Sequence, residues 1–293
     1  MVNEFLFLLF IAQYSFFISG VDLVSLDAHC HWSFYEDDLE SALAELNVHP
    51  ILVVSVSGEP SAYQKTLEIA KRSPYIIPAF GIHPSRAAEY VNQLDQFTDL
   101  IINCLMLGEI GLDHFFIKDT SQYPVQRQLF EFFLNKAKTH NLIVNLHTKG
   151  ADEETITLLD AYGITRVIMH GYEGPIELLA KVVDRGFYIT VSQSVLPQWE
   201  TTIPHWKRIQ TIAQEVPQDL LLTETDGPGP PPRQMPYTKL QPIIAHIAKL
   251  RKTNIKEINH TVISNFQSLI HGDSKLNQYS LLLQQSQLAQ TDQ

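Results

Sequence analysis

Histidines and acids with the spacing of metal ligands are spread along the chain. His29 and His31 are one residue apart. Residues i and i+2 of a β-strand point to the same face, so these two imidazoles can bind one cation. Glu109 and Asp226 add carboxylate oxygens, and mixed nitrogen and oxygen ligands suit Zn, Mn or Fe, or Mg that keeps several waters. The further candidates are His83, His147 and His170.

The elements that must position these residues can be read from hydrophobic periodicity. From Val21 onward, short apolar runs rich in β-branched residues alternate with amphipathic segments. The predicted strands are Leu23–His29, Ile51–Val56, Ile76–Gly81, Leu105–Gly111, Leu142–His147, Arg166–His170, Phe187–Val191 and Leu220–Glu224. Predicted helices between them include Asp37–Asn47, Ser61–Arg72, Val125–His140, Asp152–Tyr162 and Ile176–Arg185. Eight strands with intervening helices predict a single-domain α/β fold, the parallel (β/α)8 TIM barrel.

The strand ends explain why the candidate ligands should meet. Each candidate falls at or just after the carboxyl end of a predicted strand, and in such a barrel these ends open onto one face, where active sites are built. The alternative is an open doubly wound sheet. Its Gly-rich phosphate turn is missing after the first strand, where the sequence reads His29-Cys30-His31.

Five or six ligands exceed what one tetrahedral ion needs, so two ions bridged by Glu109 are expected. Two metals about 3.5 to 4 Å apart can clamp an in-line displacement at phosphorus and generate hydroxide near neutral pH. The predicted chemistry is therefore metal-dependent hydrolysis.

Composition limits the partners. The chain has 293 residues, 45% of them hydrophobic, which excludes a disordered protein. Its 21 Lys and Arg against 32 Asp and Glu give a net charge of −11, which argues against a broad cationic face for duplex DNA. Two cysteines exclude a disulfide framework.

The two ends of the chain differ from the middle. Residues 1–22 form an apolar extension whose run Phe5–Ser19 follows the single early charge, Glu4. It lacks the basic start of a signal peptide and is short for a membrane span. We expect a cytoplasmic protein without a stable membrane partner, and a signal peptide or membrane-associated anchor is the alternative. Residues 272–293 are rich in Gln and Leu and predict a frayed helix or disorder, which leaves 23–271 as the barrel domain.

Ordered motifs along the barrel resemble one family. They read LDAHCH at 26–31, FGIHP at 80–84, GEIGLD at 108–113, LHTK at 146–149, MHGY at 169–172, RGFYI at 185–189, TETD at 223–226 and SNF at 264–266. Together they resemble the TatD family of metal-dependent hydrolases, the TatD-like deoxyribonucleases of the amidohydrolase superfamily. The resemblance covers about Leu23 to Ile270, and GEIGLD is its most specific part.

The resemblance implies roles for individual residues. His29 and His31 would hold one metal with Asp226, and Glu109 would bridge to a second metal, which His147 and His170 would hold. Asp226 would also act as the general base. His83 would lie near the scissile phosphate, and Lys149 could neutralise charge that develops on it.

Some positions depart from the family pattern. Ser33 and Lys149 stand where the family commonly has Asp and Arg, and His114 stands where an aromatic residue such as Tyr is usual. Lysine keeps the positive charge but loses the planar fork that binds two phosphate oxygens, so substrate preference could differ. No departure removes a metal ligand.

Three functions follow from these observations. The first is a divalent-metal-dependent phosphodiesterase on DNA, preferably at single-stranded ends, with Mg, Mn or Zn bound. The second is an amidohydrolase, esterase or small phosphoesterase on the same barrel, because the same hydroxide attacks carbonyl carbon. The third is a non-catalytic scaffold, which the complete ligand set opposes. Trp199, Trp206 and Tyr172 follow late strands, where loop packing is the expected role and stacking on a nucleobase the alternative.

Overall fold

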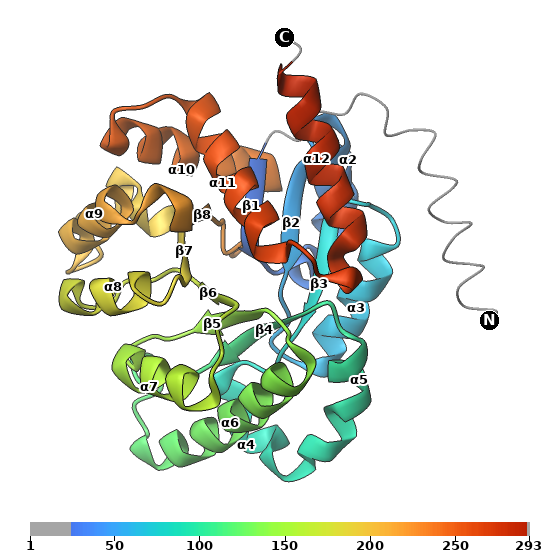
Figure 1. Cartoon of the computed structure of the whole chain (residues 1–293), viewed down its shortest axis with the longest axis vertical. Helices are drawn as coiled ribbons and strands as arrows, with labels where there is room; N and C mark the ends of the chain where they lie inside the picture. Colours follow the sequence, from blue (N-terminus) through green and yellow to red (C-terminus); the bar gives the residue numbers. More distant parts are fainter. Residues whose placement is uncertain (1–24, 292–293) are drawn as a thin grey trace.

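A ring of eight parallel strands forms the centre of the molecule (Figure 1). The computed structural model describes residues 25–291. Each strand pairs in parallel with the next, in the order β1 to β8. The strands are β1 (Ser25–Cys30), β2 (Ile51–Ser55), β3 (Ile76–Phe80), β4 (Met106–Gly111), β5 (Val144–His147), β6 (Val167–Met169), β7 (Tyr188–Val191) and β8 (Leu221–Thr223). The prediction of a (β/α)8 barrel is confirmed, and sequential pairing rules out the doubly wound alternative.

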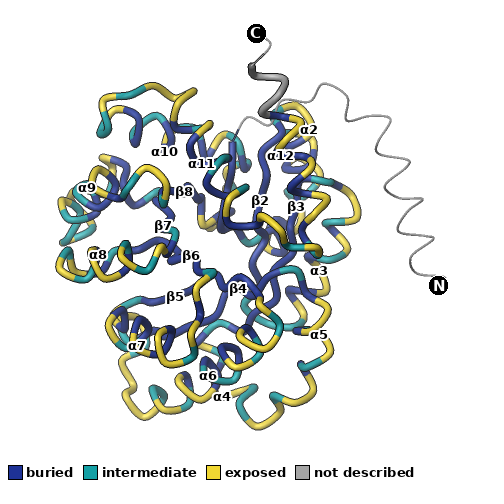
Figure 2. The backbone as a smooth tube through the Cα atoms, in the orientation of Figure 1, coloured by how far each residue is buried: buried dark blue, intermediate teal, exposed yellow. Residues whose placement is uncertain are grey.

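Helices surround this ring on the outside, as Figures 1 and 2 show. They are α2 (Leu39–Val48), α3 (Pro60–Ala70), α4 (Ala87–Tyr90), α5 (Thr98–Asn103), α6 (Tyr123–His140), α7 (Asp152–Tyr162), α8 (Ile176–Val183), α9 (Trp206–Glu215), α10 (Pro236–Arg251), α11 (Ile255–Ile270) and α12 (Asn277–Thr291). Their inner faces are buried and their outer faces exposed, whereas the strands are buried almost throughout. Apolar surface is thus removed from water on both sides of the sheet.

Helix α6 illustrates how the sequence produces these elements. Its first turn contains Pro124, whose fixed φ suits the start of a helix. Leu129, Phe130 and Phe133 are buried at helical spacing and pack toward β4. The helix ends where Asn141 adopts a left-handed conformation, with φ of 50°.

The ring closes where β8 meets β1. The amide of Asp226 donates to the carbonyl oxygen of His29 at 3.0 Å, and the amide of His31 donates to that of Gly227 at 2.7 Å. The hydroxyl of Thr223 donates to the carbonyl oxygen of Leu26 at 2.6 Å. These bonds tie the last strand to the first and place the ends of both strands side by side.

The C-terminal segment takes the helical one of its two predicted forms. Residues 272–293 were expected to be a frayed helix or disordered, and Asn277–Thr291 form α12, in which Tyr279, Leu282 and Leu283 are buried. The hydroxyl of Tyr279 donates to the carbonyl oxygen of Ile76 in β3 at 3.0 Å. The helix therefore packs on the barrel through its apolar face.

The predicted extension 1–22 lies outside the described residues. Within residues 25–291, none of the helices is both long enough and apolar enough to span a bilayer. Cys30 and Cys104 are both buried and free.

The burial of α12 predicts a measurable contribution to stability. Leu283→Ala should lower the free energy of unfolding by about 2 to 5 kcal/mol, because it removes a fully buried side chain. Leu281→Ala, two positions earlier and half-exposed, should change it by less than about 0.5 kcal/mol. Urea denaturation of both variants measures the difference, and equal midpoints would show that α12 does not pack on the barrel.

Candidate metal centre

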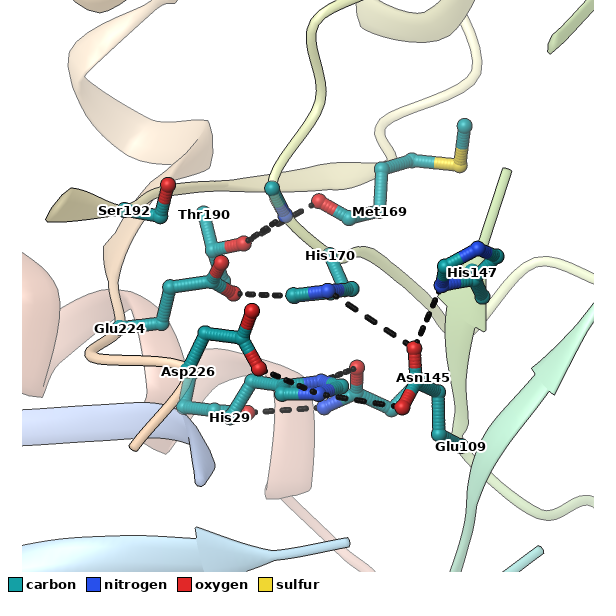
Figure 3. A network of polar contacts seen from close by, with 12 residues as sticks. His29, Glu109, Asn145, His147, Met169, His170, Thr190, Ser192, Glu224 and Asp226 are labelled. Atoms are coloured by element: carbon teal, nitrogen blue, oxygen red, sulfur yellow. Dashed lines mark hydrogen bonds and ion pairs between the residues drawn. The ribbon is translucent and has the colours of Figure 1, made fainter. Parts of the chain in front are cut away.

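The carboxyl ends of the strands bring the predicted ligands together in one cluster. Figure 3 shows several of these side chains converging from different strands. Three groups place their ligand atoms within 4.8 Å of one another. They are His29, His31 and Asp226; His29, Glu109 and His170; and His83, Glu109 and His147.

Glu109 lies at the centre of this cluster, and its two oxygens face different partners. Oε2 lies 3.3 Å from Nε2 of His31 and 3.6 Å from Nε2 of His29. Oε1 lies 2.6 Å from Nδ1 of His147 and 3.8 Å from Nε2 of His170. A carboxylate arranged in this way can bridge two cations.

Neighbouring polar groups fix which nitrogen each imidazole presents. Nδ1 of His29 lies 2.9 Å from Oδ1 of Asn145, whose amide nitrogen donates to the carbonyl oxygen of Ala28. The amide oxygen is therefore an acceptor, so Nδ1 of His29 carries the proton and Nε2 is free to bind a metal. Nδ1 of His170 similarly lies 2.8 Å from Oε2 of buried Glu224. Partners of this kind orient metal-binding histidines and raise their basicity.

His147 and His83 occupy the other side of Glu109. Nε2 of His147 lies 3.2 Å from Oδ2 of Asp113, and its Nδ1 faces Oε1 of Glu109. Nε2 of His83 lies 3.3 Å from Nδ1 of His147 and 3.7 Å from Oε1 of Glu109. His83 therefore lies at ligand distance from the centre, and its predicted place near the scissile phosphate stays a prediction.

The cluster as a whole fits metal ions. Nε2 of His29 is buried and has no hydrogen-bond partner, although it faces Glu109 and Asp226 at 3.6 and 3.9 Å. Such separations are too long for hydrogen bonds. They match the spacing of two ligands bound about 2.1 Å from one tetrahedral ion, which is about 3.4 Å.

His170 lies between the two groups of ligands. Its ring stacks on that of His29, with centroids 3.6 Å apart, and its centroid lies 6.2 Å from that of His147. Two imidazoles that bind one ion from different sides can have centroids this far apart, so the division of ligands that the resemblance implies, with His29, His31 and Asp226 on one metal and His147 and His170 on the other, stays a prediction.

The carboxylates of the cluster are ionised. Burial alone raises the pKa of Glu109, but the charges of His83 and His29 and a hydrogen bond with His147 outweigh it and hold this pKa well below its usual range. Burial also opposes ionisation of Asp226, yet nearby histidines lower its pKa to about 2. The side chain of Asp226 is 44% exposed and faces the cavity. Its charge is therefore available to a ligand.

The pKa values of His29 and His83 are shifted in opposite directions. Burial lowers the pKa of His29, but Glu109 and the nearby acids reverse this and raise it to about 10. Burial dominates at His83 and lowers its pKa to about 4. In the metal-free protein a proton on His29 thus balances the acids, while His83 stays neutral at pH 7.

Glycine permits the close approach of β4 and β5 below the cluster. Gly111 has φ of 142°, a conformation that other residues rarely adopt. A Cβ atom there would lie 2.0 Å from the carbonyl oxygen of His147. Any other residue at this position would push β5, and with it His147, away from Glu109.

A cavity of about 770 Å³ lies above the cluster. Residues at or after the ends of all eight strands line it, so the loops form its walls and it opens to solvent above them. Lys149 lines it too, with Nζ donating to the carbonyl oxygen of Gly171 at 2.6 Å and lying 3.6 Å from Oε2 of Glu173.

Three residues of the centre were not predicted as functional. They are Asp113, Asn145 and Glu224. Asn145 and Glu224 each stand two residues before a predicted ligand, so the rule that residues i and i+2 share a face of an extended strand could have identified them. Asp113 follows β4, where no periodicity applies.

The fold and the ligand set define a metal-dependent hydrolase built on a (β/α)8 barrel. The family model for "TatD related DNase" matches residues 26–271, so the chain belongs to the TatD family.

Relatives agree with this assignment. The human "Deoxyribonuclease TATDN3" is 25% identical over 268 residues, covering 84% of this chain and 94% of its own length. The "Uncharacterized metal-dependent hydrolase YabD" of Bacillus subtilis is 26% identical, covering 84% of this chain and 98% of its own. The crystal structure of the TatD homologue YjjV from Escherichia coli superposes with a TM-score of 0.74 at 23% identity. It covers 84% of this chain and 97% of YjjV, which supports the fold.

The raised pKa of His29 predicts that metal binding releases protons. A ligand imidazole must be neutral, so a metal that binds at pH 7 must displace the proton from His29. Binding therefore strengthens as pH rises, by up to about tenfold per unit for each proton released. Calorimetric titration of the metal-free protein with Mn²⁺ in two buffers of different ionisation enthalpy measures this release, and equal heats in both would contradict it.

Glu224 should tune metal affinity through His170. Glu224→Gln keeps the size but removes the charge that faces Nδ1 of His170, so metal affinity should fall by roughly 10- to 100-fold. Glu68→Gln, which changes an exposed acid on α3, serves as the matched control. Competition with a chromophoric chelator measures both affinities. Equal affinities in the two variants would argue that Glu224 does not support the centre.

Proposed function

We propose that this protein is a deoxyribonuclease that uses two divalent metal ions, Mg, Mn or Zn, to cut phosphodiester bonds at exposed DNA ends. The observation that carries the two-metal part is the position of Glu109, whose Oε2 faces His29 and His31 while its Oε1 faces His147. The DNA substrate rests on membership of the TatD family and on the name of the human relative.

We assign the residues of this centre to two metal sites and to proton transfer. His29, His31 and Asp226 would hold one ion, and His147 and His170 would complete the second site with Glu109 as the bridge. Bound divalent ions supply Lewis acidity for the phosphoryl group. The carboxylate of Asp226 is ionised at neutral pH and open to the cavity, so it can accept a proton from water as the water oxygen forms its bond to phosphorus. The bond from phosphorus to the leaving oxygen then breaks, and the proton held by Asp226 can pass to that oxygen.

His83 and Lys149 complete the proposed catalytic set beside Asp226. His83 is neutral at pH 7 and lies at ligand distance, so it can bind a metal or contact the phosphate. Lys149 lines the cavity, but its ammonium is already shared with Gly171 and Glu173. We assign it to balancing charge on the phosphate, and its preformed contacts hold it in position for that role.

The shape of the cavity supports action at ends. Residues after all eight strands line the cavity, so the loops form a rim around the metal ligands, and a terminal nucleotide can enter this depression without a strand having to bend into it from both sides. A single-stranded end reaches the centre without the cost of unpairing bases. The net charge of −11 also disfavours extended duplex binding.

A comparison of linear and circular substrates tests the proposal. Metal-loaded protein should shorten linear single-stranded DNA from its ends in Mg²⁺ or Mn²⁺, and EDTA should abolish the reaction. Circular single-stranded DNA of the same sequence should survive, because it has no end. Turnover of an amide or ester panel with no cleavage of DNA would refute the nuclease, and cleavage of the circle would refute the restriction to ends.

Glu109→Gln tests the bridge. Loss of a residue that contacts only a metal ligand, such as Glu224, typically costs roughly 10- to 100-fold. Removing the charge of Glu109 should reduce DNA cleavage by more than that, and should lower the number of tightly bound metals. Glu68→Gln is again the control. Activity close to that of the control, with two metals still bound, would show that Glu109 does not bridge them.

A further inference from the structure

Three exposed phenylalanines stand at the rim of the cavity. Phe34, Phe115 and Phe116 are 50%, 50% and 67% exposed and line the same cavity as the metal ligands. Phe34 follows β1, and the other two follow β4. Large apolar side chains gathered at the mouth of a polar site are typical of ligand-binding positions.

The rings differ in how freely they can accept a ligand. Phe34 stacks on His31, with centroids 5.3 Å apart and planes inclined by 16°. Phe115 has the ammonium of Lys118 over its ring at 4.7 Å, and Phe116 meets it edge to face. Phe116 is the most exposed of the three, so its ring is the most accessible to a ligand.

The turn that carries Phe115 and Phe116 is fixed to the metal centre. Both amides donate to Oδ1 of Asp113, at 3.0 and 2.7 Å, while Oδ2 of Asp113 faces His147. The amide of Phe115 also donates to the carbonyl oxygen of Lys149. One buried carboxylate thus sets the position of a metal-binding histidine and of the exposed rings, so the rings are held in register with the centre.

The charges of the cavity leave few contacts for phosphate outside the metal centre. Among the described residues that line it, the fixed cations are Arg86 and Lys149. Arg86 pairs with Glu59 at 2.7 Å, and Lys149 lies beside Glu173. Two dications would bring +4 to the centre itself. Phosphate recognition is therefore concentrated there, and the outer cavity must bind the remainder of a nucleotide by other means.

We propose that Phe116, with Phe34 on another side of the cavity, forms a stacking site for the nucleobase beside the scissile phosphate. This inference rests on the proposed deoxyribonuclease function. A base offers a flat face whatever its identity, so the site would accept all four bases and would require an unstacked one. Of the aromatic residues considered from sequence, Tyr172 is buried, and the indole of Trp206 donates to the carbonyl oxygen of Leu196. Trp199 also lines the cavity, but it is partly buried and packs against the core, whereas Phe116 is mostly exposed.

The test varies the ring and the base together, with metal-loaded protein. Phe116→Ala, Phe116→Leu and Phe116→Trp are assayed on a linear single-stranded oligonucleotide and on the same strand with an abasic terminal nucleotide. Phe116 is chosen because its ring meets that of Phe115, whereas the ring of Phe34 stacks on the metal-ligand candidate His31. Leucine keeps apolar bulk without a π-face, and tryptophan keeps the face, so the pair separates stacking from simple packing.

Stacking predicts a specific pattern. On the normal strand, the alanine and leucine variants should raise KM by roughly 5- to 100-fold, the loss should fall on KM rather than on kcat, and tryptophan should restore KM. On the abasic strand, the alanine variant should match the wild type, because the base that the ring would bind is already gone. A 2-aminopurine base in a strand with an uncleavable terminal linkage should be quenched by the wild type and not by the alanine variant.

The outcomes separate the two proposals. If the wild type cuts DNA but the alanine and leucine variants keep its KM, the stacking site is wrong and the deoxyribonuclease stands. An equal loss of KM on normal and abasic strands would also overturn the stacking site, because the ring would then act without a base. If the wild type cuts no DNA in any metal, both proposals fail.

Discussion

Closure of the barrel between β8 and β1 is the constraint on which the site depends. His29 and His31 come from the end of the first strand and Asp226 from just beyond the last, so these ligands meet only when the ring is complete. The buried carboxylate of Asp27 holds the seam, because its two oxygens accept hydrogen bonds from the amide and the hydroxyl of Thr225, at 2.9 and 2.6 Å. Burial raises the pKa of Asp27 to about 7, which indicates how little solvent reaches this joint.

Burying the charged groups of the metal centre lowers the stability of the fold, and packing elsewhere in the barrel must offset this. Buried charges are expensive to remove from water unless they are paired, and this cluster concentrates several carboxylates at the end of an apolar ring. In the metal-free protein, protonated His29 supplies part of the balance beside Glu109. Cations complete it more fully, because the buried Nε2 of His29 has no other partner. Stability therefore comes from the strand and helix packing, and the centre is tuned for binding.

The sequence predicts those parts of the structure whose hydrophobic residues recur with a regular period. Strands and helices repeat every 2 and 3.6 residues, so the eight strands and the ligands at their ends, such as Glu109 and His170, could be placed closely. For residues 272–293 the Gln-rich composition left a frayed helix or disorder as alternatives, whereas the helical spacing of Tyr279, Leu282 and Leu283, all buried in α12, favours a packed helix. The end of β3 predicts where His83 lies, but the direction of its side chain depends on the turn that follows, where it accepts a hydrogen bond from the amide of Ser85, and strand periodicity does not extend into that turn.

The contrast between regular strands and irregular loops also divides the cavity into a part that holds the metal ligands and a part that can select the substrate. The inner cavity is built from strand ends, whose geometry the barrel dictates, and it supplies the charge that attracts a phosphate. The outer cavity is built from loops, where Arg86 and Lys149 are each paired with an acid, so it adds little long-range attraction. For a protein of net charge −11, selectivity must then come from short-range contacts, which act only after the metal centre has positioned the phosphate. Exposed rings anchored through Asp113 meet that requirement, since their distance from the centre is fixed by the carboxylate that also faces His147.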